Sequence, residues 1–428
     1  MDDSLTMPSI TAKKTANSEI PKHNKGDSHS SEWISPLDHQ LNLHFETLAK
    51  ISSTKELKEN PLYRTLERQV DTILNSVDHD SFAGPRQTVE SQGIIAAAWN
   101  IERGIKFEGI VETLKENSML RQSDLLLITE MDYGMARTGN VFVARELARA
   151  LGMNYVFAPC YINLEKGSGL EARAEGENKQ ALHGNGILAR YPLLRAHSIV
   201  LPNGKDKMRG KEKRLGSQRV AVADMAHPDG EVRLASLHLD AHSTQRHRRD
   251  QIRIVLDHLD RLQPRLPVLL GGDWNTTTYN SKRAAYAIAG FARRVMMGVG
   301  YFVETHYPYP YKWFERHLFR ELEERGYDFR SLNELGVGTL HYDVKDLSHN
   351  TNLADWVPKW CFWFMEKALE KQNGRASLKL DWFSAMGLEP DPAFPPVVLG
   401  GLRHNDAALS DHDPIMVGLR LPMHIGKS

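Results

Sequence analysis

Cysteine is scarce in this chain, with two residues, Cys160 and Cys361, among 428. Two thiols cannot build a disulfide framework, and so low a content is typical of a reducing compartment. Long apolar runs are also lacking: those at 93–99 and 268–272 fall far short of the roughly 20 residues that span a bilayer. The first residues contain no apolar run of the kind that a secretory signal needs. We therefore expect a cytoplasmic protein without stable membrane insertion, and nothing in the sequence indicates an obligate protein partner.

An excess of either charge is lacking as well, because Lys plus Arg and Asp plus Glu each number 54. Such a chain has no global positive field, so any binding of a polyanion must come from local patches. The basic loop at 204–219 and the arginines at 246–253 are the candidates. Hydrophobic residues make up 41% and charged residues 25%, which is globular usage and excludes a wholly disordered chain. No repeat of fixed period is present.

The N-terminal part of the sequence divides into two segments before the main domain. Residues 1–32 are polar with almost no apolar periodicity, which predicts a disordered tail. Within 33–90, apolar residues recur at steps of three and four, which predicts two amphipathic helices. A connector rich in Gly, Pro and Ser follows them and marks a domain boundary.

From residue 91 to 424, short apolar runs alternate with helical patterns, which indicates an α/β domain. We expect strands at 94–101, 124–130, 186–190, 197–202, 219–225, 232–239, 267–273 and 414–421, with helices near 107–121 and 140–151. Several later strands follow one another through short connections, which disfavours a purely parallel sheet. The sequence thus predicts a four-layered α/β sandwich in which two mixed or antiparallel central sheets are flanked by helices.

Acidic, amide and imidazole side chains stand at the ends of these apolar runs. They are Asn100, Glu102, Glu130, His238, Asp273, Asn275, Asp381, Asp411 and His412. A buried acid costs several kcal/mol in desolvation unless it is paired or bound to a metal. Several such groups at one sheet edge therefore indicate a site for a hard cation. Oxygen ligands with few thiols favour Mg²⁺, with Mn²⁺ as the alternative, over zinc.

Seven short motifs occur along the domain in a characteristic order. They are WNIERG at 99–104, LLITEMD at 126–132, HGNGILARYPL at 183–193, SLHLDAH at 236–242, GGDWN at 271–275, LDW at 380–382 and SDHDPI at 410–415. With them the chain resembles the endonuclease/exonuclease/phosphatase superfamily, which includes deoxyribonucleases, abasic-site endonucleases, inositol 5-phosphatases and neutral sphingomyelinases. One such motif would be weak evidence, whereas seven in this order are strong evidence.

The resemblance implies roles for the residues that carry the motifs. Glu130 would be the principal Mg²⁺ ligand, with Asn100 and Asp411 beside it. Asp273 would orient or deprotonate the attacking water, and Asn275 would hold the phosphate. These two are separated by one position, so they project to the same side if the strand geometry continues.

The histidines of the motifs would stabilise charge. His412 resembles the family's C-terminal histidine, and Asp381 would fix its tautomer, so that the pair supports an imidazolium against a developing phosphorane. His238 would lie near the leaving oxygen as a donor or general acid. Either Asp273 or the Asp381–His412 pair could activate the water. Glu102 is either a neighbour of the metal ligands or a solvated charge.

Two further residues are candidate contacts to the phosphodiester substrate, Asn185 in the central motif and Arg249 in the basic run. Histidines at 238, 242 and 247 could form a zinc cluster, but the run that begins at 243 is typical of a capped helix start with its basic residues facing out. We therefore disfavour zinc there.

Asp381 follows Asn275 by 106 positions (381 − 275), which predicts a mainly helical insertion at about 279–376. Its Trp356, Trp360 and Trp363 stand at helical spacing, as in a packed apolar face, a lid, or a surface that holds bases or lipid. The expected function is a Mg²⁺-dependent phosphoesterase that cleaves a phosphodiester by in-line attack of water, acting as a nuclease or as a lipid or small-molecule phosphodiesterase. The alternative is a non-catalytic binding protein on the same fold, and the complete catalytic set favours the enzyme.

Overall fold

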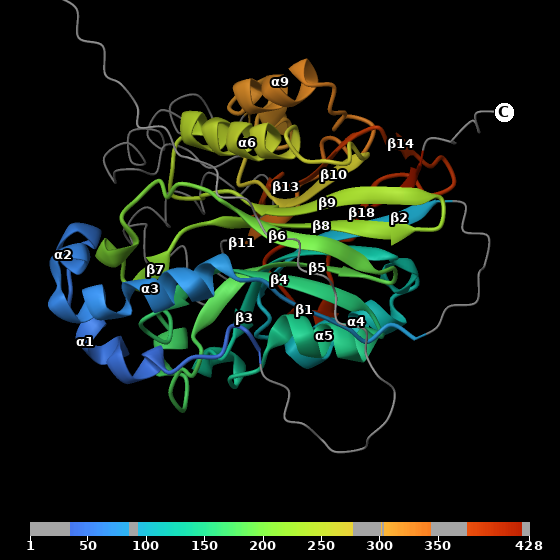
Figure 1. Ribbon diagram of the computed structural model, residues 1–428. Coiled ribbons are helices and arrows are strands. Elements are labelled where there is room, and N and C mark those ends of the chain that lie inside the picture. Colours follow the sequence, from blue (N-terminus) through green and yellow to red (C-terminus); the bar gives the residue numbers. More distant parts are fainter. Residues whose placement is uncertain (1–34, 85–92, 277–300, 302–303, 344–374, 422–428) are drawn as a thin grey trace, which may run out of the picture. The chain divides into compact units, whose positions relative to one another are not determined.

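Two β-sheets lie face to face at the centre of this computed structural model (Figure 1). The structure describes residues 35–84, 93–276, 301, 304–343 and 375–421. The predicted disordered tail at 1–32 lies outside these residues. Contacts divide the chain after Ile34, and everything described here belongs to the unit Ser35–Ser428.

The first sheet has nine strands and is mixed. Its main path runs in the order β1 (Asp78–Ser81), β4 (Asn154–Asn163), β5 (Leu182–Ala189), β3 (Leu125–Tyr133), β2 (Ile94–Arg103), β18 (Ile415–Arg420) and β14 (Glu389–Pro390), with β7 (Arg214–Gly216) on β4 and β15 (Val397–Val398) on β18. Only β2 and β3 pair in parallel in this sheet, among the strands that the structure describes.

The second sheet has five strands, and its register sets up the site. The order is β13 (Asp381–Met386), β10 (Val268–Asp273), β9 (Gly230–His238), β8 (Arg219–His227) and β6 (Leu193–Val200). Asp273, at the end of β10, is paired with His238 on the parallel strand β9 and with Asp381 on the antiparallel strand β13. Three motifs that are far apart in sequence therefore meet at one edge.

Helices cover the outer faces of both sheets (Figure 1). The second sheet carries α6 (Gln245–Leu259) and α9 (Arg316–Glu324), and the first carries α4 (Phe107–Glu116) and α5 (Val143–Leu151). The Thr244 hydroxyl caps α6 by accepting a hydrogen bond from the backbone of His247, as the sequence predicts. Apolar residues of α6 then repeat at helical spacing and pack on β9 and β10. The predicted four-layered α/β sandwich is confirmed.

Most of the predicted strands occur with small shifts in their ends, whereas β4 was missed. All ten residues of β4 are buried, because it lies inside the first sheet with helices on one side and the second sheet on the other. A strand buried on both faces has no alternation of polar and apolar residues that could reveal it. The predicted helix near 107–121 ends earlier, at Glu116, and a short 3₁₀ helix at Leu120–Gln122 follows it.

The segment predicted as N-terminal helices contains three of them, α1 (Phe45–Ala49), α2 (Thr54–Glu59) and α3 (Pro61–Asn75). Asn60 separates α2 from α3, because its side chain accepts from Tyr63 N and Pro61 fits the first helical position. β1 follows α3 and pairs with β4. The N-terminal helices are thus continuous with the first sheet.

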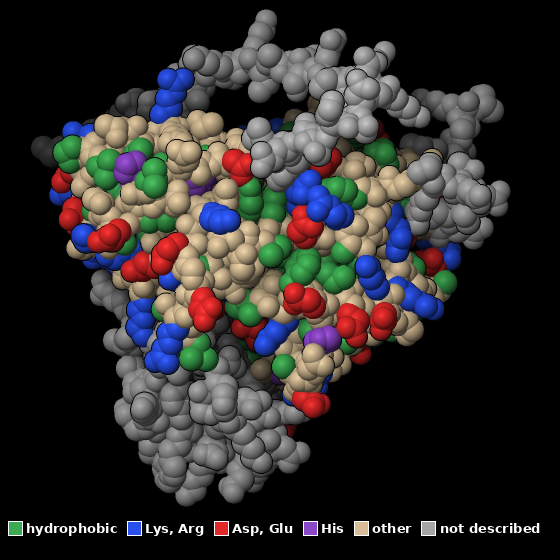
Figure 2. Space-filling view, turned by 90° about the horizontal axis from the view of Figure 1, so that it is seen from below, with side chains coloured by type: hydrophobic (Ala, Val, Ile, Leu, Met, Phe, Trp, Pro, Cys, Tyr) green, Lys and Arg blue, Asp and Glu red, His purple; other side chains and the backbone are tan. Residues whose placement is uncertain are grey.

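The predicted insertion is described only in part. That part contains a 3₁₀ helix at Pro310–Lys312, α9, and the strands β11 (Leu340–Asp343) and β12 (Arg375–Leu378), which pair with each other. Trp356, Trp360 and Trp363 lie outside the described residues. Within the described residues, no helix has the length and apolar character to cross a membrane. Figure 2 shows acidic and basic side chains interspersed over one face, as the balanced charge of the chain leads one to expect.

Candidate active site

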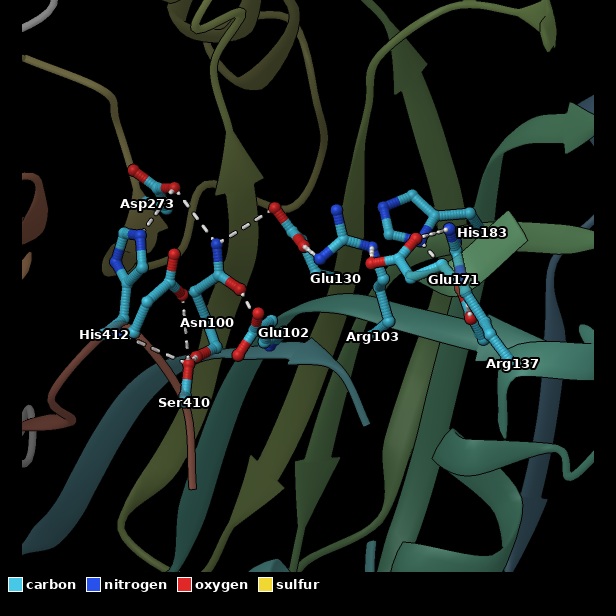
Figure 3. A network of polar contacts seen from close by, with 12 residues as sticks. Asn100, Glu102, Arg103, Glu130, Arg137, Glu171, His183, Asp273, Ser410 and His412 are labelled. Carbon is cyan, nitrogen blue, oxygen red and sulfur yellow. Dashed lines mark hydrogen bonds and ion pairs between the residues drawn. The ribbon is translucent and has the colours of Figure 1, made fainter. Parts of the chain in front are cut away.

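The Asp273 carboxylate is the centre of a cluster of polar side chains (Figure 3). Its Oδ2 accepts a hydrogen bond from Asn100 Nδ2 at 3.1 Å, and its Oδ1 accepts from the backbone of Asn275 at 2.9 Å. His238 Nε2 lies 3.4 Å and His412 Nε2 3.7 Å from Oδ2. Asp273 is 2% exposed. Side chains from both sheets therefore converge on one buried carboxylate.

The backbone at the site departs from regular strand geometry. Glu130 has a φ of 57° at an irregularity in the pairing of β3, and Asn275 has a φ of 51° directly after β10. Left-handed backbone at residues other than glycine is strained and tends to occur at functional sites. Gly272 has a φ of 130°, and a Cβ there would lie 2.2 Å from the Leu237 carbonyl oxygen. The second glycine of GGDWN is thus required for β10 to approach β9.

Asn100 links Glu130 to Asp273, because the same Nδ2 group also donates to Glu130 Oε1 at 3.3 Å. The backbone of Glu130 donates to Asn185 Oδ1 at 3.4 Å. Burial favours the neutral acid, yet Arg103 and the nearby histidines hold the pKa of Glu130 well below its ordinary value. Glu130 is therefore a carboxylate in its anionic form.

A chain of alternating charges extends from Glu130 away from Asp273 (Figure 3). Arg103 NH1 lies 3.6 Å from Glu130 Oε2, and Arg103 Nε lies 3.2 Å from Glu171 Oε1. Arg137 bonds the other oxygen of Glu171 at 2.9 Å and holds Asp132 through two hydrogen bonds of 2.7 and 2.9 Å. The sequence motifs assign no role to these residues. Arg103 stands in WNIERG, so its motif was a usable signal, whereas Glu171 belongs to no motif.

His412 and Asp381 form the expected pair. His412 Nδ1 donates to Asp381 Oδ2 at 2.8 Å, and both side chains are buried. Burial disfavours the imidazolium, but Asp381 and Asp273 hold the pKa of His412 well above its ordinary value. The Trp99 indole donates to the His412 carbonyl oxygen at 2.8 Å. This geometry presents a fixed positive charge, with Nε2 turned toward Asp273.

Comparison with a family model identifies the family of this chain. The sequence matches the model of the endonuclease/exonuclease/phosphatase family over residues 97–412, which is most of the chain. The chain belongs to this family. The resemblance drawn from the seven motifs is thereby confirmed. Membership supports a hydrolase that acts on phosphoester bonds.

Comparison with solved structures finds several chains of low sequence identity. An endonuclease/exonuclease/phosphatase from Beutenbergia cavernae is 17% identical, with 77% of this chain and 72% of that chain covered and a TM-score of 0.45. A humanized TDP2 from D. rerio is 14% identical, with 77% and 100% covered and a TM-score of 0.42. The 3'-5' exonuclease NExo from Neisseria meningitidis is 14% identical, with 76% and 98% covered and a TM-score of 0.41. These low scores add nothing about function, and no curated protein matches the chain.

Family enzymes typically use divalent metals, and two further acidic residues interact electrostatically with Glu130. Burial raises the pKa of Glu102 to about 8, and repulsion from Asp411 adds to the effect. Burial and repulsion from Glu130 likewise raise the pKa of Asp411. The three acidic groups thus repel one another, and a divalent cation would relieve this repulsion.

Among the described residues, the group whose possible ligand atoms all lie within 4.8 Å of one another is Asp273, Asp381 and His412. In this group the negative charges already face the His412 imidazolium, so the need for a cation is smaller. In the part of the chain that the structure describes, Glu130, Glu102 and Asp411 do not form a group of this kind.

The two predicted substrate contacts lie in different surroundings. Asn185 is buried on β5, where its Nδ2 donates to the Arg219 carbonyl oxygen at 2.8 Å and its Oδ1 accepts from Glu130. Arg249 bonds its neighbour Asp250 on α6, and within the described residues it has no contact with the Asp273 cluster. The structure therefore brings Asn185 beneath Glu130, and does not bring Arg249 into the cluster.

The disfavoured zinc cluster does not assemble. His238 lies at Asp273, whereas His247 Nε2 lies 3.0 Å from the Pro202 carbonyl oxygen. Burial and neighbouring lysines lower the pKa of His242 to about 4.

Proposed function

We propose that this protein is a divalent-cation-dependent phosphodiesterase that cleaves its substrate by in-line attack of water, as a nuclease or as a lipid or small-molecule phosphodiesterase. The observation that carries the proposal is the convergence of Asn100, His238, Asn275 and His412 on the Asp273 carboxylate. Family membership supports the broader reaction class.

Asp273 is the general base in this proposal. Burial raises its pKa above the ordinary value, despite the opposing effect of His412 and His238. A carboxylate of raised pKa is a better proton acceptor, provided that it is still ionised at the working pH. The pKa of His412 is shifted upward as well, so its imidazolium keeps its proton and does not compete for that of the water. Asp273 therefore takes the proton, and the Asp381–His412 pair supplies positive charge.

The remaining groups hold the phosphate and the leaving oxygen. His412 Nε2 and the Asn275 side chain donate to phosphate oxygens, where negative charge grows during the attack. His238 donates a proton to the leaving oxygen. Asn185 accepts a hydrogen bond from the Glu130 backbone and so positions Glu130. Arg249 does not contact the substrate in this proposal, and at most attracts an anionic substrate toward the site.

Glu130, Asn100 and Asp411 are the proposed ligands of Mg²⁺ or Mn²⁺, with Glu102 beside them. A bound divalent cation supplies Lewis-acid stabilisation of a phosphoryl oxygen. Arg103 keeps Glu130 anionic and turned toward this position, since it lies against the second carboxylate oxygen.

The test is Mg²⁺-dependent hydrolysis of a substrate panel. The panel pairs bis(p-nitrophenyl) phosphate with plasmid DNA, RNA, sphingomyelin and inositol phosphates, each with and without chelator. Asp273→Asn is the blank, and Asp257→Asn, a carboxylate on α6 that bonds Arg325, is the matched control. Turnover that is lost in Asp273→Asn and kept in Asp257→Asn supports the site and names the substrate. Absence of turnover by the folded protein on every member would favour a non-catalytic binding protein.

A further inference from the structure

Thr339, which precedes β11 in the inserted region, bonds the backbone of the catalytic strand β13. Its Oγ1 accepts hydrogen bonds from the backbone N–H groups of Leu380 and Asp381, both at 3.1 Å. Thr339 is 0% exposed, so water does not compete for these bonds. A hydroxyl oxygen has two acceptor positions, and both are used here. One side-chain atom therefore fixes the point at which Asp381 enters the site.

The same residue also bonds the loop that carries His412. The Asp413 backbone N–H donates to the Thr339 carbonyl oxygen at 2.7 Å, and Leu340 forms an isolated antiparallel bridge with His412. The chain around Thr339 thus contacts both partners of the Asp381–His412 pair. Asp381 begins β13 of the second sheet and His412 lies in the loop before β18 of the first sheet, so the length of their side-chain hydrogen bond depends on the separation of these two segments.

His341, two residues further along, adds a side-chain contact on the same loop. Its Nε2 lies 2.6 Å from Asp413 Oδ2, and its Nδ1 lies 2.7 Å from the Ser377 hydroxyl on β12. The second oxygen of Asp413 accepts from the backbone of Gly401 at 3.3 Å. His341 therefore joins the two-stranded sheet of β11 and β12 to the residue that follows His412.

We propose that Thr339 and His341 are positioning residues, which hold the Asp381 and His412 backbones at the separation that the 2.8 Å hydrogen bond between their side chains requires. The proposal rests on the function given above. It assigns to the described part of the insertion a role in aligning the catalytic pair. Thr339 Oγ1 bonds the backbone of Asp381, and the His341 imidazole bonds the Asp413 side chain in the loop that carries His412.

Thr339→Val tests the hydroxyl, because valine keeps the shape of threonine and removes both acceptor positions. We expect kcat for bis(p-nitrophenyl) phosphate to fall on the order of 100-fold, as for other small displacements of catalytic groups. KM should stay near that of the unchanged protein, since the proposed function assigns substrate contacts to neither Thr339 nor His341. Thr339→Ser keeps the acceptor and should restore kcat. Loss of kcat in the serine variant as well would overturn the role given to the hydroxyl.

Ser384→Ala is the control for a general loss of stability. Ser384 lies on the same strand β13, is 0% exposed, and loses one buried hydrogen bond, from its Oγ to the Asp328 carbonyl oxygen at 3.0 Å. It does not contact Asp381 or His412, so its kcat should not change. An equal fall of kcat in Ser384→Ala and Thr339→Val would mean that any weakening of β13 suffices, and would overturn the proposal.

A second measurement does not depend on turnover. The proton between His412 Nδ1 and Asp381 should give a low-field signal in the ¹H spectrum, assigned by its loss in Asp381→Asn. We expect this signal to shift or broaden in Thr339→Val and to be unchanged in Thr339→Ser. An unchanged signal in Thr339→Val would overturn the positioning role of Thr339, even if the substrate of the enzyme is unknown. A changed signal, with no turnover by either the unchanged protein or its variants, would count against the proposed function and not against the positioning role.

His341→Ala covers the case in which Thr339→Val does not fold. The His341 side chain is 39% exposed, so its removal leaves no buried cavity. We expect a smaller fall in kcat than for Thr339→Val, an unchanged KM, and a change in the same low-field signal. Unchanged kcat and an unchanged signal in His341→Ala would overturn the assignment of His341.

Discussion

Lys379 is a buried cation beside the catalytic strand, and its removal should stabilise the protein. The residue is 0% exposed, and its Nζ has no hydrogen-bond partner in the part of the chain that the structure describes. Burial lowers the pKa of Lys379 to about 8, although Asp381 and Glu334 favour the charged form. The fall from 10.5 to about 8 corresponds to roughly 3 kcal/mol, because one pKa unit is worth about 1.4 kcal/mol. The folded protein bears this cost at pH 7.

Lys379→Met removes the charge and keeps the length of the side chain. It also removes the contact of Nζ with the Trp382 ring, whose centroid lies 5.1 Å away. Such a contact contributes about 0.5–2 kcal/mol, so the net gain in the free energy of unfolding at pH 7 should be about 1–3 kcal/mol. Urea unfolding measures this gain. Lys55→Met, at an exposed lysine on α2, is the control and should change little.

The sign of the pH dependence gives a second check. Above pH 8 the folded protein releases the Lys379 proton, whereas the unfolded chain keeps it until about pH 10.5. The unfolded state then binds more protons, so Lys379 adds stability as the pH rises, by up to about 1.4 kcal/mol per pH unit. The difference between the unchanged protein and Lys379→Met should therefore shrink from pH 8 to pH 10. The opposite result would be a Lys379→Met variant that is less stable than the unchanged protein at pH 7, with a difference in the free energy of unfolding that does not change from pH 8 to pH 10. It would refute the claim that the buried charge is costly and would indicate that the Lys379 cation is firmly paired.

Three further substitutions test the site and its support. Asp273→Asn should lower hydrolysis by at least about 100-fold, as loss of a general base does, while thermal unfolding stays unchanged or rises; retained turnover would exclude Asp273 as the base. Glu130→Gln should weaken Mn²⁺ binding by more than about 10-fold in calorimetry, and an unchanged affinity would exclude Glu130 as a ligand. Arg137→Lys keeps the charge but loses the two-bond contact with Asp132, which should cost about 1–3 kcal/mol in urea unfolding; equal stability would show that this contact contributes nothing.

The convergence of polar side chains on Asp273 is predictable from sequence because these residues stand at strand ends. His238, Asp273 and Asp381 each end or begin an apolar run, and the register of β9, β10 and β13 brings them side by side. A polar group after a buried strand needs a partner, so several such groups indicate one shared site. Arg249 lacked this signal. It was chosen from a basic run, and the helix that this run forms gives it Asp250 as its partner.

The groups that support the cluster could not be predicted in the same way. Glu171 lies in a connection between β4 and β5, and its contact with Arg103 depends on how that connection folds over β2 and β3. The pairing irregularities that turn Arg103 and Glu130 toward each other leave no trace in the pattern of apolar residues. A charged residue in a loop is usually solvated, so sequence alone predicts that Glu171 is exposed to water, whereas in the structure it pairs with Arg103 and Arg137.

The contacts of Thr339 could not be predicted from the sequence either, because this residue bonds backbone groups of the neighbouring segments. It accepts from the N–H groups of Leu380 and Asp381 and receives the N–H of Asp413 at its own carbonyl oxygen. Every residue except proline has a backbone N–H group, so almost any residue type could stand at these three positions and donate the same hydrogen bond. A threonine between a glycine-rich turn and a short strand is ordinary in sequence, and only its position between two catalytic segments distinguishes it. Motifs therefore point to the side chains proposed to act on the substrate, whereas residues that bond the main chain beside them have to be found in the folded structure.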